Sequence, residues 1–136
     1  MDPLATPAAA PVRVLVVEDD PDDARHTFRA LRRSGRFEPV HARTATEALE
    51  QAVAGAFGAC LLDFRLPDMS GIELCRRLRE LGIATPVVLL SSVESDSAAD
   101  RAARAGADDF LVKHLRYGET LEAEMSRILE ARHGCA

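Results

Sequence analysis

Acidic, hydroxyl and ammonium side chains follow four apolar segments of the sequence, each at the point where the segment ends. Glu18, Asp19 and Asp20 follow VRVLVV, and Asp63 follows ACLL. Two serines end PVVLLSS, and Lys113 ends DDFLVK. Clustered carboxylates repel one another unless a cation joins them, and their hard oxygens suit Mg²⁺, which also binds phosphate oxygens. A hydroxyl and an ammonium nearby suit a phosphoryl group, for which an aspartate can be the covalent acceptor.

The basic residues are almost all arginine. Of the 17 basic side chains 16 are arginine, and Lys113 is the one lysine of the sequence. This suggests that position 113 needs a compact ammonium rather than a planar guanidinium. The net charge of −5 argues against direct binding of nucleic acid, which favours a basic surface.

Length and composition predict one folded domain. The 136 residues are 47% hydrophobic and 29% charged, which is typical of a globular protein. No apolar run approaches the roughly 20 residues of a membrane span. We expect a disordered tail at residues 1–11, a domain at 12–132 and a short tail at 133–136. The three cysteines lack ligand or disulfide spacing, which favours a reducing, cytoplasmic setting.

Apolar segments alternate with amphipathic ones along the chain. Helices are predicted to follow each strand, the first capped by Asp20 with Pro21 at its first position. The helix in SGIELCRRLRELG is expected to bury Leu78 and Leu81, and Pro39 places its strand at a sheet edge. The strands are predicted at 12–18, 37–42, 58–63, 86–92 and 108–113.

Four of the five predicted strands are continuous apolar runs. Such strands are typical of a parallel sheet with helices on both faces, here a doubly wound α/β fold. In this fold, ligands bind beyond the carboxyl ends of the strands. We therefore expect the acids, the serines and Lys113 to gather at one edge of the sheet.

Several segments in order resemble the receiver domain of two-component response regulators: VLVVEDDP, LLDFRLPDMSG, VVLLSS and AGADDFLVK. The resemblance covers about residues 12–132. It implies a flavodoxin-like (βα)5 fold with strand order 2-1-3-4-5. It also implies that Asp63 takes a phosphoryl group from a histidine kinase or a histidine phosphotransfer protein, and that the domain then signals to an output domain or target protein.

The resemblance also implies a metal site and a phosphoryl site. Asp19 would bind Mg²⁺ (or Mn²⁺) directly, with Glu18 assisting through water. The metal would also take Asp63 and the backbone carbonyl of Arg65. Lys113 would contact the phosphoryl group.

Further positions correspond to the conformational switch of the family. Ser91 would move toward the phosphoryl group, and Phe110 would turn inward when it does. Arg65 and Val93 match the variable positions that tune hydrolysis of the phosphoaspartate. The resemblance further allows a homodimer through the face of the fourth helix, fifth strand and fifth helix.

One segment departs from the family pattern. The family usually has proline after its lysine, across a cis bond, whereas this chain has Lys113-His114. A cis bond before a non-proline residue costs about 3 kcal/mol, so we predict a trans bond and a reshaped loop.

Three other functions fit parts of the sequence. A degenerate receiver would bind partners without phosphorylation, and the Lys113-His114 departure favours it. An aspartate-nucleophile phosphohydrolase of the haloacid dehalogenase type needs a second aspartate where Arg65 stands. A flavodoxin-like electron carrier needs a hydroxyl-rich loop after the first strand. The leading hypothesis is a receiver that catalyses only its own phosphorylation and dephosphorylation, and not an enzyme acting on other substrates.

Overall fold

The computed structural model describes residues 10–113 and 117–134, with side chains up to residue 132. Almost all of the predicted N-terminal tail lies outside the described residues. The bond between Lys113 and His114, predicted to be trans, lies outside them too. Of the predicted tail at 133–136, only the backbone of 133 and 134 is described, as the end of the last helix.

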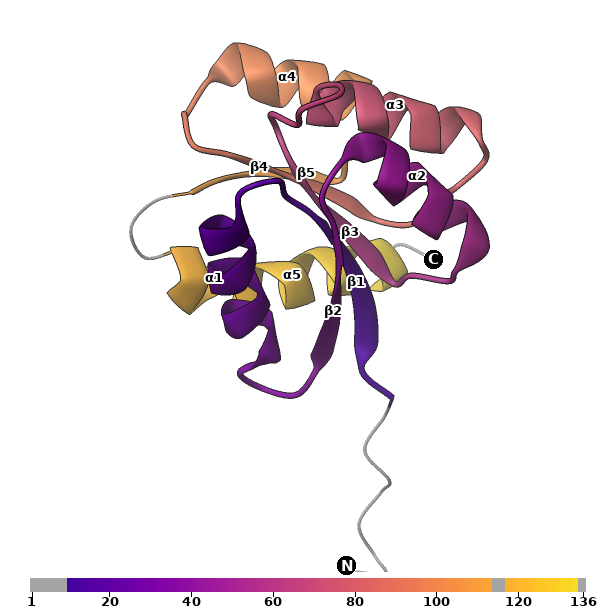
Figure 1. The fold of residues 1–136 in the computed structure, drawn as a ribbon. Helices are drawn as coiled ribbons and strands as arrows, with labels where there is room; N and C mark the ends of the chain where they lie inside the picture. The colour runs from indigo at the N-terminus through magenta and orange to yellow at the C-terminus, as the bar shows by residue number, and fades with distance from the viewer. Residues whose placement is uncertain (1–9, 114–116, 135–136) are drawn as a thin grey trace, which may run out of the picture.

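Within the described residues, five strands and five helices alternate along the chain (Figure 1). The strands are β1 (Val12–Val17), β2 (Phe37–Ala42), β3 (Ala59–Asp63), β4 (Val87–Ser91) and β5 (Asp109–Val112). The helices are α1 (Pro21–Arg32), α2 (Ala45–Ala54), α3 (Gly71–Glu80), α4 (Asp96–Arg104) and α5 (Tyr117–Gly134).

The strands form one parallel sheet in the order β2-β1-β3-β4-β5, which confirms the predicted topology. β1 lies between β2 and β3, with Val14 opposite both Pro39 and Ala59. The chain therefore reverses its direction of travel across the sheet at β1, and the carboxyl ends of β1 and β3 flank the switch point. Pro39 lies in an edge strand, as predicted.

Successive residues of β1 point into two different cores. Val14 and Val16 pack in the layer of α1 and α5, whereas Leu15 and Val17 pack in the layer of α2, α3 and α4. All four side chains are at most 2% exposed. The continuous apolar run of the sequence is thus explained by burial on both faces of the sheet.

Helix caps account for several of the observed helix boundaries. Asp20 caps α1, its Oδ1 accepting hydrogen bonds from the backbone N–H of Asp22 at 2.8 Å and of Asp23 at 3.2 Å. One predicted core position was wrong: Leu81 is 57% exposed, whereas Leu74 is fully buried. α3 ends at Glu80, and Gly82 takes a positive φ, so the chain turns away before Leu81 can face the sheet.

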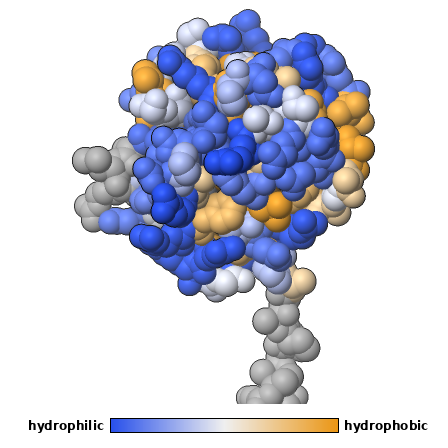
Figure 2. All heavy atoms as spheres, viewed as in Figure 1, coloured by the Kyte–Doolittle hydropathy of each residue, from blue (hydrophilic) through white to orange (hydrophobic). Residues whose placement is uncertain are grey.

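The exterior is mostly hydrophilic on the face shown in Figure 2. Apolar side chains reach this surface between α1 and β2, where Ala24 and Phe28 line a shallow groove bordered by Arg25 and Arg43. Among the described residues, no helix is long and apolar enough to cross a membrane.

Candidate functional site

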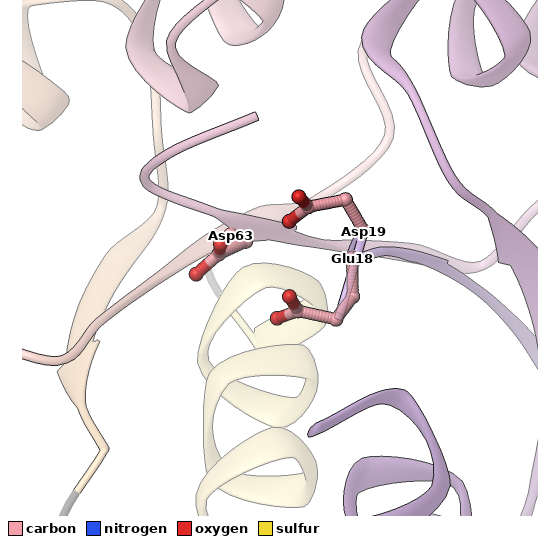
Figure 3. Close-up of side chains that lie close together, drawn as sticks. All are labelled: Glu18, Asp19 and Asp63. Atoms are coloured by element: carbon pink, nitrogen blue, oxygen red, sulfur yellow. The ribbon is translucent and has the colours of Figure 1, made fainter. Parts of the chain in front are cut away.

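Three carboxylates meet at the carboxyl ends of β1 and β3 (Figure 3). Glu18 and Asp19 directly follow β1, and Asp63 is the last residue of β3. One carboxylate oxygen from each lies within 4.8 Å of the others. Glu18 is buried, Asp63 is half-buried and Asp19 is exposed, so the group opens toward solvent on one side. The structure thus brings together the acids that the sequence predicts, while Asp20 is the helix cap.

Lys113 is the cation of this site. Its Nζ donates a hydrogen bond to Glu18 Oε2 at 2.8 Å and lies 3.1 Å from Asp63 Oδ1 and 3.3 Å from Asp23 Oδ2. The lysine side chain is only 10% exposed. One buried ammonium therefore faces three carboxylates, with Asp19 as a fourth acid nearby.

Burial and charge shift the protonation equilibria of the site. Burial raises the pKa of Glu18 and of Asp63, and the neighbouring ammonium of Lys113 lowers each of them by less. Burial by itself lowers the pKa of Lys113, but the hydrogen bond with Glu18 and the charge of Asp63 outweigh it, so that its net shift is upward. Lys113 thus stays charged, and the carboxylates retain an excess of negative charge that a divalent cation would neutralise.

Backbone contacts fix Glu18 in place. The N–H of Asp20 donates to Glu18 Oε1 at 3.1 Å, and the Glu18 N–H donates to the carbonyl of Ala42 at 3.0 Å. His41 Nε2 lies 2.7 Å from the Glu18 carbonyl oxygen. Glu18 is thereby held by the β1–α1 turn and by the end of β2.

The loop after Asp63 is tight because α3 begins directly against the end of β3. A Cβ on Gly71 would lie only 2.3 Å from the carbonyl oxygen of Asp63, so only glycine fits there. The Gly71 N–H donates to the Phe64 carbonyl at 2.8 Å, and Arg65 forms an isolated bridge with Ser70. The glycine of LPDMSG therefore helps to position Asp63. The role of the Arg65 carbonyl as a metal ligand stays a prediction.

The two residues of the predicted switch lie on the same side of β3: Ser91 ends the neighbouring strand β4, and Phe110 lies in β5. Ser91 Oγ donates to the Val93 carbonyl at 2.8 Å and accepts from the Val93 N–H at 3.1 Å, so the hydroxyl is turned into its own loop. Phe110 is partly buried and packs edge-to-face on Phe64, with ring centroids 6.4 Å apart. Phe64 directly follows Asp63, which places Phe110 one side chain away from the acceptor. Val93 is 61% exposed.

A pocket of about 320 Å³ lies over Asp63 and Lys113. Asp23 lines it and contacts Lys113, although the sequence predicted for Asp23 only a place in the first turn of a helix and no role in the site. The sequence feature that could have indicated this role is the second acid pair of EDDPDD, Asp22 and Asp23. The first turn of α1 brings Asp23 back to the end of β1. Phe64 and Arg101 also line the pocket, and Arg101 comes from α4, outside the segments that carry the family resemblance.

Comparisons with known proteins agree with this arrangement. Residues 14–124 match the model of the response regulator receiver domain. The chain belongs to this family. Response regulators of two-component systems interact with histidine kinases and output domains, and this receiver has the fold and the acidic cluster that such a role uses. The match favours a receiver over the phosphohydrolase and electron-carrier alternatives.

Two curated relatives and one solved structure show the extent of the likeness. The chain is 37% identical over 122 residues to the response regulator MprA of Mycolicibacterium vanbaalenii, covering 88% of this chain and 51% of that protein. It is 39% identical over 126 residues to the transcriptional regulatory protein PrrA of Mycobacterium bovis, covering 91% and 52%. The receiver domain of the putative response regulator NarL from Mycobacterium tuberculosis superposes with a TM-score of 0.80 at 30% identity, covering 88% of this chain and 98% of that domain. This receiver thus spans about half the length of the curated relatives.

Proposed function

We propose that this receiver accepts a phosphoryl group on Asp63 from a histidine kinase or a histidine phosphotransfer protein, in a Mg²⁺-dependent reaction. The observation that carries the proposal is the carboxylate of Asp63 at the base of an open pocket, 3.1 Å from the buried ammonium of Lys113 and beside two further acids. Lys113 and a bound divalent cation would both favour the ionised form of the acceptor, and an ionised carboxylate can attack phosphorus without a general base.

The donor set fits Mg²⁺. Carboxylate oxygens from Glu18, Asp19 and Asp63 are hard ligands, and three of them leave positions for water and for phosphate oxygens. The ion, held by these residues and the Arg65 carbonyl, would supply charge neutralisation for the phosphoryl oxygens. An Asp63 oxygen attacks phosphorus, and the bond to the donor breaks. Lys113, already 3.1 Å from Asp63, can donate to the new phosphoryl group without a large movement.

Phosphorylation would then move Ser91. Its hydroxyl exchanges its bonds with Val93 for one to the phosphoryl group, and Phe110 turns inward into the space that Ser91 vacates. The packing of Phe110 on Phe64 supports this coupling, because Phe64 is the residue directly after Asp63. The displaced α4–β5–α5 face would signal to an output domain or target protein, or support a homodimer.

The remaining positions would set the lifetime of the signal. Arg65 and Val93 flank the pocket over Asp63 and would tune access of water to the phosphoaspartate. We propose that the domain catalyses only its own phosphorylation and dephosphorylation, in the cytoplasm, and does not act as an enzyme on other substrates.

Phosphate-affinity electrophoresis after incubation with acetyl phosphate and Mg²⁺ tests this function. A shifted band is expected, which disappears in Asp63→Asn and on chelation of Mg²⁺. Asp22→Asn is the matched control, because Asp22 is an exposed acid paired only with Arg25 in the described structure. Absence of labelling, together with absence of beryllofluoride binding, would instead establish a degenerate receiver that binds its partners without phosphorylation.

A further inference from the structure

The pocket over Asp63 has a cationic wall on α4 that the phosphorylation mechanism does not use. Ala98 and Arg101 both line the pocket, and residues three apart lie on the same face of a helix. Ala98 is only 8% exposed, so this face of α4 is turned toward the body of the domain. Ser97, one turn before Arg101, also lines the pocket. Arg101 itself is exposed to solvent, and it borders the pocket together with Ser97 and Ala98 of the same helix.

Arg101 has no acidic partner among the ion pairs of the described residues. Its neighbour Asp100 pairs with Arg104 at 3.0 Å instead. Glu94 and Asp96, the other acids at the start of α4, do not line the pocket. The two acids that do line it, Asp23 and Asp63, are within 3.3 Å of Lys113. The charge of Arg101 thus remains available to an anion that enters the pocket.

The pocket has room for more than a phosphoryl group. A water molecule takes about 30 Å³ of liquid volume, so about 320 Å³ holds a phosphoryl group and several further atoms. In an in-line transfer the leaving group departs on the side of phosphorus opposite the attacking oxygen. Asp63 and Lys113 lie on the strand side of the pocket and Arg101 lies on the helix side. The leaving group therefore departs away from the carboxylates, within the part of the pocket that α4 borders.

We propose that Arg101 binds the carboxylate leaving group of small acyl phosphates and so selects them as phosphodonors of this receiver. The inference rests on the proposed phosphorylation of Asp63. In the transfer from acetyl phosphate, an Asp63 oxygen bonds to phosphorus and the bond between phosphorus and the acyl oxygen breaks. Acetate leaves with the electron pair, and no proton is required. A guanidinium matches a carboxylate with two parallel hydrogen bonds, and it stabilises the charge that develops on the leaving oxygen.

Comparing different phosphodonors distinguishes binding of the leaving group by Arg101 from a general electrostatic attraction of the donor into the pocket. Phosphoramidate carries the same phosphoryl group, but its nitrogen departs as neutral ammonia. A phosphohistidine donor likewise leaves as an imidazole that has taken a proton. Arg101 has no anionic leaving group to bind in either case, so its removal should affect only acyl phosphates.

The test compares initial rates of phosphorylation with acetyl phosphate and with phosphoramidate, in Mg²⁺, for the wild type, Arg101→Gln, Arg101→Lys and Arg104→Gln. Loss of a hydrogen bond to a charged group should lower the acetyl phosphate rate of Arg101→Gln by about tenfold and leave the phosphoramidate rate unchanged. Arg101→Lys keeps the charge but loses the two parallel N–H donors of the guanidinium, so its rate with acetyl phosphate should lie between those of the wild type and Arg101→Gln. Arg104→Gln is the matched control, since Arg104 lies on the same helix and pairs with Asp100.

Each other outcome counts against the role. Equal losses with both donors would show that Arg101 only stabilises α4 or attracts the phosphoryl group, and would overturn the selection of acyl phosphates. Rates equal to the wild type with both donors would overturn any contact with the leaving group. If the wild type itself takes no phosphate from either donor, the proposed function fails, and this inference fails with it. Thermal unfolding of each variant shows whether α4 is still packed.

Discussion

The charged side chains at the two ends of the parallel sheet are arranged in opposite ways. At the amino ends of β4 and β5, the carboxylate of Asp108 lies 3.1 Å from Arg79 and 2.7 Å from Arg132, and it accepts a hydrogen bond from the Val87 N–H at 2.8 Å. At the carboxyl ends, the single ammonium of Lys113 faces three carboxylates. The amino end surrounds one acid with donors, whereas the carboxyl end surrounds one cation with acids.

The difference separates a stabilising network from a reactive one. Arg79 also donates to the carbonyls of Ile83, Thr85 and Gly106, so it joins the end of α3 to the α3–β4 loop and to the α4–β5 loop. Among the described residues, Asp108, Arg79 and Arg132 are paired with one another there. At the carboxyl end the fold leaves negative charge unbalanced, which lowers its own stability and creates an affinity for a cation and a phosphoryl group. Stability and function are thus concentrated at opposite edges of the same sheet.

Lys113 should be the most sensitive charge in the protein. Lys113→Met leaves Glu18 and Asp63 without their buried counterion and should lower the free energy of unfolding by about 3 kcal/mol, measured by urea denaturation without Mg²⁺. It should also abolish phosphorylation of Asp63, because the phosphoryl oxygens lose their ammonium donor. A variant that keeps wild-type stability would show that the carboxyl end is not organised around this lysine.

Lys113→Arg is the sharper variant because it keeps the charge. The lysine side chain is 10% exposed among three acids, where a planar fork has a different shape and reach from a point charge. We expect stability between those of the wild type and Lys113→Met, and clearly slower phosphorylation. If this variant is phosphorylated at the wild-type rate, position 113 does not need an ammonium in place of a guanidinium, contrary to the inference from the single lysine of the sequence.

The network at the amino end should affect stability without affecting chemistry. Arg79→Met removes donors from three carbonyls and from Asp108, and should lower the free energy of unfolding by about 2 kcal/mol in urea denaturation. The folded fraction should be phosphorylated at the wild-type rate. Arg76→Met is the control, because Arg76 makes only exposed pairs within α3, with Glu73 and Glu80. Slower phosphorylation in Arg79→Met would contradict the division of roles between the two ends.

At the carboxyl end, removing an acidic side chain should raise the free energy of unfolding rather than lower it. Asp63→Asn relieves the repulsion among carboxylates whose oxygens lie within 4.8 Å of one another, and should raise the free energy of unfolding by about 1 kcal/mol without Mg²⁺. Mg²⁺ should stabilise the wild type more than this variant, because the ion loses a ligand. A loss of stability on this substitution would show that the pairing of Asp63 with Lys113 outweighs the repulsion. The charges at the carboxyl end would then be balanced within the fold, as they are at the amino end.

The sequence predicted the sheet because its apolar runs are continuous, and continuous runs identify strands buried on both faces. It also predicted that Glu18, Asp63 and Lys113 lie together, because the ends of parallel strands share one edge. Two residues show what it could not give. Arg101 reaches the pocket through the packing of α4, which no local pattern records. Leu81 fits the period of its helix, yet it lies outward because the helix ends one residue earlier.

Asp68 shows that an acid near the carboxyl end can also be fully satisfied. Its carboxylate accepts hydrogen bonds from the N–H groups of Ala45 and Thr46, each at 2.9 Å, and from the Thr46 hydroxyl, which joins the β3–α3 loop to the start of α2. Slight burial raises the pKa of Asp68, but these hydrogen bonds lower it more, to about 2.

The stabilisation by Asp68 should therefore depend on pH. It is complete above the unfolded pKa near 3.8 and is lost as the pH falls through the folded value of about 2. Asp68→Ala removes an exposed acceptor of the first N–H groups of α2, a role like that of a helix cap, and should lower the free energy of unfolding by about 1 kcal/mol at pH 7. Urea denaturation between pH 2 and 5 should show the two proteins converging as Asp68 becomes protonated. A difference that stays constant to pH 2 would mean that Asp68 stabilises the fold through packing rather than through its charge. The contrast between Asp68, whose charge is satisfied by hydrogen bonds, and the cluster of Glu18, Asp19 and Asp63 would then not hold.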